Sequence, residues 1–462
     1  MLRSQTQVPP LPPSAGSWLL GKPGSRRFSG KSTCVSKIVR KIIVGKGKSV
    51  TYDRTSESFS SIVPSSASSP PNRTLVYALD FIETVCQFKG FSMNEDKTLG
   101  DLAKWHVQKL IRFATNVRVP VFAFLDTLSQ DSIIRNVQNV ERGRDRETSS
   151  SGAKLILNAT QCTRIETLPY ALKTCWTFKK VFRPVYFRIL HEVFRDVMAT
   201  FRGRKTLVLI GGIQPGSNMD DVNVSCCGAT FEVGDLLFAP QTLGRTQSDV
   251  KRLQKGYFAL QSISKVGQGE LMCSYLARLL DVHSTTQSWS VVIVSRDADS
   301  IVAHAPAVSA FTSNRVNVYS LLRRRKSKPI FKGLETTYFL YIDIVIDYSR
   351  FSSDLVDLGY KGGWLDIAAS YCFIVNDVIP RTAITLAQFL ESLLLGYSTS
   401  PSSAHLAKFS KSTTNAIKKG VELEVTQMVE ILKRIWHSKL KSSIEITKEY
   451  DSLDLTFLRG LD

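Results

Sequence analysis

Short apolar runs alternate with longer helical patterns along most of the chain after residue 73. Five runs predict β-strands: Thr74–Leu79, Val119–Leu125, Thr206–Ile210, Ser290–Val294 and Tyr338–Ile346. Apolar residues recur at helical spacing over Leu99–Phe113, Phe178–Phe201, Gly269–Leu280, Leu365–Ile374, Thr385–Leu395 and Val421–Leu440. Strands that are apolar throughout and alternate with helices are typical of a parallel sheet covered on both faces. The predicted fold class is therefore α/β, with a parallel, mixed-edge sheet flanked by helices.

The first 73 residues differ from the rest in composition. They contain 12 Lys or Arg against two acids, Asp53 and Glu57, and eight of the 17 prolines. Such a composition predicts a disordered basic arm over 1–73, before a core over 74–400 with insertions and a helical C-terminal extension over 401–462. The arm has three interpretations: a solvated tail without a role, an auxiliary contact to nucleic acid or a nuclear import signal, or a mitochondrial transit peptide.

Net charge, hydrophobicity and cysteine spacing favour or exclude several kinds of partner and site. Lys and Arg number 60 against 40 Asp and Glu, a formal net charge of +20, which favours a polyanionic partner. No apolar run reaches the roughly 18–20 residues that span a bilayer, so we expect no membrane partner. The eight cysteines include no CxxC pair, which argues against a disulfide framework and a zinc site. We expect an intracellular protein of the nucleus or cytoplasm.

Acidic residues follow three of the predicted strands. Asp80 and Asp126 come directly after their apolar runs, and Asp297 and Asp299 follow Ser290–Val294. Ligands of open parallel sheets bind beyond the carboxyl ends of the strands, where these side chains would converge. Alternatively, each aspartate caps the helix that follows it.

A cluster of carboxylates is costly unless a cation compensates the repulsion. Oxygen ligands without His or Cys suit Mg²⁺ or Mn²⁺, and acid clusters of this kind commonly hold two ions for phosphodiester cleavage. No P-loop or dinucleotide-binding motif follows a strand. The sequence Gly211-Gly212-x-x-Pro-Gly after Thr206–Ile210 is either a phosphate cradle or, as we favour, a plain turn.

Three further segments carry a family resemblance. Gly267–Tyr275, followed by Ile293–Ile301, resembles the G-E-G-E helix start and D-A-D-L-I strand end of the Xrn-family 5′→3′ exoribonucleases, and Phe373–Pro380 is similar to that family's F-x-G-N-D-F-L-P motif. Flap endonucleases share the acid layout, so the resemblance implies a PIN/FEN-like nuclease core. It also implies a set of metal ligands: Asp80, Asp126, Glu270, Asp297, Asp299 and Asp377.

The resemblance further implies a basic helix that receives the substrate's 5′ phosphate. The corresponding stretch is Asp131–Arg146, where Arg135, Gln138 and Arg142 recur at helical spacing. Guanidinium groups bind a terminal phosphate through charge-assisted bonds. Arg144 or Arg146 is an alternative ligand, and a solvated charged loop is the interpretation without a function.

The chain also departs from the family pattern. Gln268 replaces the first Glu of G-E-G-E, and Val375 replaces a glycine, so one of seven acids is lost. The leading hypothesis is a Mg²⁺-dependent nuclease that degrades RNA from a 5′ phosphate by a two-metal mechanism. The alternatives are a structure-specific flap-type DNA nuclease and a degenerate nuclease that only binds nucleic acid. The oligomeric state stays open.

Two groups of residues are weaker candidates for contacts to nucleic acid. Trp105, Tyr257 and Trp364 are candidates for stacking on an unpaired base, although a tryptophan in an apolar pattern usually belongs to the core. The basic run Arg323–Lys328 is expected on a loop, where it would contact phosphate, act in nuclear import or simply be solvated.

Overall fold

The computed structural model describes less than the whole chain. The residues it describes are 50–53, 73–84, 99–117, 119–127, 179–200, 206–212, 224–227, 231–233, 236–238, 246–284, 286–295, 304, 308, 315–326, 340–374, 384, 386–399, 405–409 and 421–444. Asp297, Asp299 and Asp377 lie outside these ranges, as do Arg135, Gln138 and Arg142.

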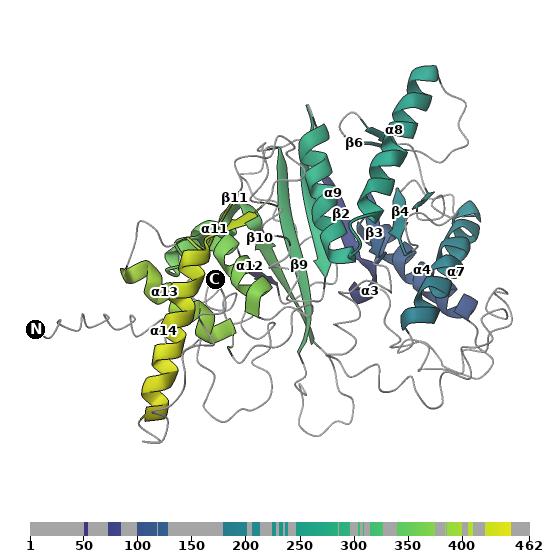
Figure 1. The fold of residues 1–462 in the computed structure, drawn as a ribbon. Coiled ribbons are helices and arrows are strands. Elements are labelled where there is room, and N and C mark those ends of the chain that lie inside the picture. The colour runs from purple at the N-terminus through teal and green to yellow at the C-terminus, as the bar shows by residue number, and fades with distance from the viewer. Residues whose placement is uncertain are drawn as a thin grey trace, which may run out of the picture.

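A sheet of eight strands forms the centre of the described part (Figure 1), in the order β1-β10-β9-β8-β2-β3-β4-β5. The strands are β1 Val50–Asp53, β2 Arg73–Asp80, β3 Val121–Leu125, β4 Leu207–Gly211, β5 Val224–Cys227, β8 Ser288–Ser295, β9 Val316–Lys326 and β10 Leu340–Asp347. The five central strands, from β9 to β4, run parallel, whereas β10, β1 and β5 are antiparallel to their neighbours. The predicted α/β class with a mostly parallel sheet is confirmed.

Helices cover both faces of the sheet. The helices are α3 Phe81–Thr84, α4 Leu99–Val117, α7 Lys179–Thr200, α8 Gln247–Ser264, α9 Gly269–His283, α11 Tyr348–Asp357, α12 Gly363–Ile374, α13 Leu386–Thr399 and α14 Val425–Ile444. Tyr77 and Leu79 of β2 pack with α4 and α7 in one core, while Val76 and Ala78 pack with α9 and α12–α14 in the other. The strands are apolar throughout because both faces are buried.

The strand order changes direction at β2: the chain adds strands first on one side of β2 and later on the other. From β2 it passes to β3 and then β4 on one side, and α8 and α9 then lead to β8, which pairs with the other side of β2. Such a switch point is where open α/β sheets place their ligands, outside the carboxyl ends of the strands. The carboxyl end of β2 is therefore the expected position of a ligand site.

Several local expectations are corrected. Val50–Asp53, inside the segment expected to be a disordered arm, pairs with β10 as an edge strand. Arg323, expected on a loop, lies in β9 opposite Asp343 of β10, and this strand extends to Lys326. Val421–Leu423, expected to be helical, is a strand (β12) that pairs with β11, Ala407–Phe409. The boundaries of the arm, core and extension remain predictions.

The sequence pattern missed two described elements that bear on the site. One is α8, and the other is the hairpin of β6, Phe231–Val233, and β7, Leu236–Phe238, which packs beside it. Leu236 and Phe238 join the same core as Leu260 of α8. Within the described ranges, no helix has the length and apolar character needed to cross a membrane.

Candidate carboxylate site

Asp80 and Asp126 extend from neighbouring parallel strands toward the same face of the sheet. Asp80 is the last residue of β2 and is 3% exposed, and Asp126 directly follows β3 and is half-buried. Side chains alternate along a strand, so Asp80 follows Ala78, and Asp126 follows Phe124, onto the face that packs against α9. The positions of these two acids after apolar runs predicted that they converge, and the structure shows them on the same face of the sheet.

The first turn of α9 lies against both carboxylates. The Gly269 amide donates a hydrogen bond to Asp126 Oδ1 at 2.9 Å. A Cβ at position 269 would lie 3.2 Å from the Phe124 carbonyl oxygen, 3.3 Å from Asp80 Oδ1 and 3.5 Å from Asp126 Oδ1. Both carboxylates therefore border one small volume that a glycine leaves open.

The residue after Asp126 fixes this arrangement. The Thr127 amide donates to the Gly267 carbonyl oxygen at 2.7 Å, and the Thr127 hydroxyl donates to the carbonyl oxygen of Ser264 at the end of α8. Gly267 has a φ of 97°, a conformation that glycine adopts without strain. The end of β3 is thereby tied to the turn between α8 and α9, which delivers Gly269 to the two acids.

Glu270 contributes a third negative charge from the first turn of α9. It is half-buried, one residue beyond the glycine. The Cys273 thiol, one turn further and fully buried, has a pKa well above its usual value; burial is the largest cause, and the charges of Asp80 and Glu270 add to it. The same side chain therefore experiences the field of both acids, from β2 and from α9.

Gln268 precedes this turn as the N-cap of α9. Its backbone carbonyl accepts from the Met272 amide at 2.9 Å, but its side chain makes no capping hydrogen bond. The unpaired amides and the dipole of a helix N-terminus favour negative charge nearby. Gln268 thus directly precedes the glycine that contacts the carboxylates, without serving as the side-chain cap of its helix.

A complete metal centre is not seen in the described part of the chain. Among its residues, no group of three or more His, Cys, Asp or Glu side chains is placed to hold a metal ion. Asp297 and Asp299 follow β8, which pairs with β2 up to Val294 opposite Leu79, and both lie outside the described residues, as does Asp377. Their part in the site, and that of Arg135, Gln138 and Arg142, remains a prediction.

Two of the three candidate stacking residues have structural partners. Trp105 is half-buried against the core of α4 and α7, and Lys109 Nζ lies 3.4 Å from the centre of its ring. Tyr257 packs against the other core. The backbone of Trp364 belongs to α12, but its side chain lies outside the described set.

The diglycine at the end of β4 is accounted for by packing. Gly211 and Gly212 have φ values of 94° and 93°. A Cβ at Gly211 would lie 2.2 Å from the Leu125 carbonyl oxygen, and one at Gly212 would lie 2.8 Å from the Phe187 Cβ. These constraints explain both glycines without a phosphate.

A second buried carboxylate, missed in the sequence, organises the C-terminal helices. Asp366 of α12 has no exposed surface; its Oδ1 accepts from the amides of Leu406 at 3.1 Å and Ala407 at 2.9 Å, and its Oδ2 accepts from the Tyr397 hydroxyl. Burial raises the pKa of Asp366, and the three hydrogen bonds oppose that rise. With its acceptors engaged by the fold, Asp366 is a structural residue.

Comparison with known proteins adds no assignment. The sequence matches no protein-family model, and a search of curated proteins finds no match. The resemblance to Xrn-family nucleases therefore stays a prediction that rests on the short motifs and on the acids themselves.

Proposed function

We propose that this protein is a Mg²⁺-dependent nuclease that hydrolyses RNA from a 5′-phosphate end. The observation that carries the proposal is the convergence of Asp80 and Asp126 on Gly269, at the carboxyl ends of adjacent parallel strands and at the N-terminus of α9. The preference for RNA and for a 5′ end rests on the resemblance to the Xrn family, and the net charge of +20 favours a polyanionic substrate in general.

The donor set fits a hard divalent cation. Asp80 is almost fully buried, and the Asp126 carboxylate borders the same volume, so their mutual repulsion needs compensation. The Gly269 amide and the positive end of α9 supply part of it. Mg²⁺ or Mn²⁺, the ions that carboxylates prefer, would supply the rest.

Each residue has a distinct task in this proposal. Asp80 and Asp126 would bind the ions, joined by Glu270 and by Asp297, Asp299 and Asp377 from outside the described ranges. Bound ions of this kind hold the scissile phosphate and lower the pKa of the attacking water. Gly269 keeps Asp126 in position and leaves the space open. Arg135, Gln138 and Arg142 would hold the 5′ phosphate, as the family resemblance implies.

The test is degradation of a 5′-phosphorylated, 3′-labelled single-stranded RNA by the full-length protein with Mg²⁺. We expect loss of the RNA, abolished in Asp80→Asn and in Asp297→Ala. Asp196→Asn is the matched control, because Asp196 is an exposed acid on α7, in the other helical layer. Equal cleavage by the wild type and Asp80→Asn would refute the proposal, and preferential cutting of a DNA flap would identify a flap-type nuclease instead.

A second candidate is a nucleic-acid binder that has lost the reaction. One observation favours it: glutamine stands at position 268, where the resembled motif has an acid. This candidate predicts tight binding of the same RNA with no Mg²⁺-dependent turnover. The same assay, run beside a binding measurement in EDTA, separates the two functions.

A further inference from the structure

Helix α8 exposes a large aromatic side chain on its outer face. Gly256, Leu260 and Ile263 form the buried side of this helix, and Phe258 is 66% exposed. Figure 1 shows α8 extending beyond the sheet at the upper right. A phenylalanine left in water forgoes the stabilisation that its burial would give, so this exposed ring suggests a contact not yet made.

Lysines accompany this phenylalanine at helical spacing. Lys251 and Lys255 lie seven and three residues before Phe258, and Lys265 lies seven residues after it at the C-cap; all three lysines are exposed. A helix that docks on a protein groove repeats apolar residues at these positions. Here the repeat is Lys-Lys-Phe-Lys, so the face is cationic around a single ring.

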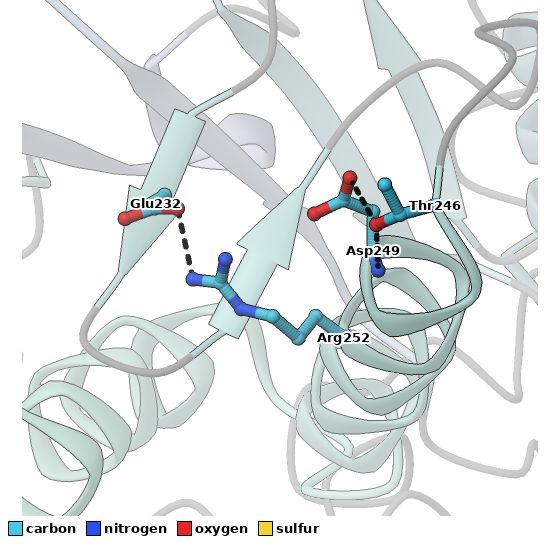
Figure 2. Close-up of polar contacts among 4 residues, drawn as sticks. All are labelled: Glu232, Thr246, Asp249 and Arg252. Atoms are coloured by element: carbon cyan, nitrogen blue, oxygen red, sulfur yellow. Dashed lines mark hydrogen bonds and ion pairs between the residues drawn. The ribbon is translucent and has the colours of Figure 1, made fainter.

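Two acids near this face, among the residues that the structure describes, are engaged elsewhere. Figure 2 shows Asp249, the one acid of α8, at the N-terminus of the helix, where its Oδ2 accepts from the Thr246 hydroxyl at 2.8 Å and its amide donates to Thr246 Oγ1 at 3.2 Å. Glu232 of β6 accepts from Arg252 Nη2 at 2.8 Å. Arg252 faces the hairpin, and the lysine face keeps its positive charge.

The C-terminal end of α8 adjoins the carboxylate site. The Thr127 hydroxyl, next to Asp126, donates to the carbonyl oxygen of Ser264, the last residue of the helix. At about 1.5 Å per residue, Phe258 lies about 9 Å along the axis from Ser264 and Lys251 about 20 Å. The cationic face therefore extends along α8 from the end near the acids to Lys251, a length that matches several nucleotides.

We propose that the outer face of α8 binds single-stranded nucleic acid, with Phe258 stacked on an unpaired base and Lys251, Lys255 and Lys265 on the backbone phosphates. Aromatic stacking beside cationic groups is how proteins hold single strands without sequence preference. Duplex bases are already stacked, so the site selects single strands. The inference rests on the proposed function, because it assigns part of the substrate's path to the carboxylates.

The test is the affinity of the full-length protein for a 3′-labelled, 5′-phosphorylated single-stranded RNA in EDTA, measured by fluorescence anisotropy over a salt series. Phe258→Ala should weaken binding about 10-fold at every salt concentration. The double substitution Lys251→Ala, Lys255→Ala should flatten the slope of log affinity against log salt by about 1.4. Matched controls are Trp436→Ala, which removes an aromatic that is 44% exposed on α14, and Lys433→Ala, since Lys433 pairs with Glu430 at 2.9 Å.

The outcomes separate the two proposals because binding is measured without Mg²⁺ and cleavage with it. A loss of affinity in Phe258→Ala, with the melting temperature unchanged, supports the α8 site whether or not the wild type cleaves RNA. Phe258→Leu, which keeps an apolar side chain but no ring, should bind as weakly as Phe258→Ala. Unchanged affinity in Phe258→Ala, or an equal loss for duplex RNA, overturns the α8 site and leaves the proposed nuclease intact.

Discussion

The backbone amide of Gly269 donates to the Oδ1 of Asp126 at 2.9 Å across a sequence separation of 143 residues. The bond joins the first turn of α9 to the residue that follows β3, and it gives Asp126 two roles. One is to satisfy an amide that α9 leaves without an intrahelical partner. The other is to present negative charge next to Asp80.

Substitutions at Asp126 should separate these roles. Asp126→Asn keeps an acceptor oxygen for the Gly269 amide, whereas Asp126→Ala removes it. We expect Asp126→Ala to lower the free energy of unfolding in urea by about 1.5–3 kcal/mol, the range for a hydrogen bond to a charged group, and Asp126→Asn to cost less. Both should abolish Mg²⁺-dependent RNA cleavage. Equal stability of the two variants would show that the hydrogen bond does not stabilise the fold.

An acid at position 268 should strengthen the proposed metal binding. Gln268→Glu places a carboxylate at the N-cap of α9, beside the volume that Asp80 and Asp126 border. Without a cation the added charge increases repulsion, and with Mn²⁺ it adds a ligand. We expect the midpoint of thermal unfolding to fall in EDTA and to rise with Mn²⁺ by more than in the wild type.

The matched control for this substitution is Gln247→Glu, at an exposed position in the first turn of α8. It adds the same charge to a helix N-terminus that is not flanked by the carboxylates. A Mn²⁺-dependent gain of the same size in both variants would attribute the effect to general charge and would count against a site at Asp80.

The Asp366 network should dominate the stability of the C-terminal helices. Asp366→Ala leaves the buried amides of Leu406 and Ala407 without their acceptor, at about 1–3 kcal/mol for each unsatisfied group. Tyr397→Phe loses one hydrogen bond to the carboxylate and should cost about 1.5–3 kcal/mol. Urea unfolding measures both. The control Asp357→Ala, at an exposed position of α11, should change the free energy of unfolding little. An equally small change for Asp366→Ala would contradict the structural role of Asp366.

The sequence predicted four of the five central strands because they are buried on both faces. β2, β3, β4 and β8 are covered on both faces, so each appears as an unbroken apolar run. The sequence pattern did not reveal elements that bury few residues or that carry many charges. Helix α8 buries only a few residues around Leu260. Because most of its other residues are polar, apolar residues do not recur clearly at helical spacing. Strand β9 ends in Arg323–Lys326, which favoured a loop by composition although the backbone pairs with β10.

The candidate site was predictable in part for the same reason. Asp80 and Asp126 follow apolar runs, and parallel strands that are neighbours bring their ends together. The bond from Gly269 to Asp126 depends on how the turn before α9 docks on β3, which no local pattern encodes. Phe258 was missed because the sequence does not state which side of α8 is buried.

Acid should weaken the fold through His191 of α7, which is buried against β4 and β5. Its Nε2 lies 2.7 Å from the Gly211 carbonyl oxygen, which only accepts, so Nε2 carries the proton and Nδ1 accepts from Ser225 Oγ at 2.8 Å. Burial, the largest cause, lowers the pKa of His191 to about 4; the bond to Gly211 opposes this, and Arg195 adds to it. The buried ring is therefore neutral at pH 7.

The folded-state pKa of His191 lies below the value of about 6.5 in the unfolded chain, so the unfolded state binds the proton more tightly. The free energy of unfolding should therefore fall as the pH drops from about 6.5 to about 4, by on the order of 3 kcal/mol from this group. His191→Gln should flatten that dependence in urea unfolding at pH 7, 6, 5 and 4.5, whereas His437→Gln, at an exposed position of α14, should leave it unchanged. His304, whose pKa burial lowers to about 3, is present in both variants, so their difference isolates His191. Parallel pH curves for His191→Gln and the wild type would mean that another group causes the acid sensitivity.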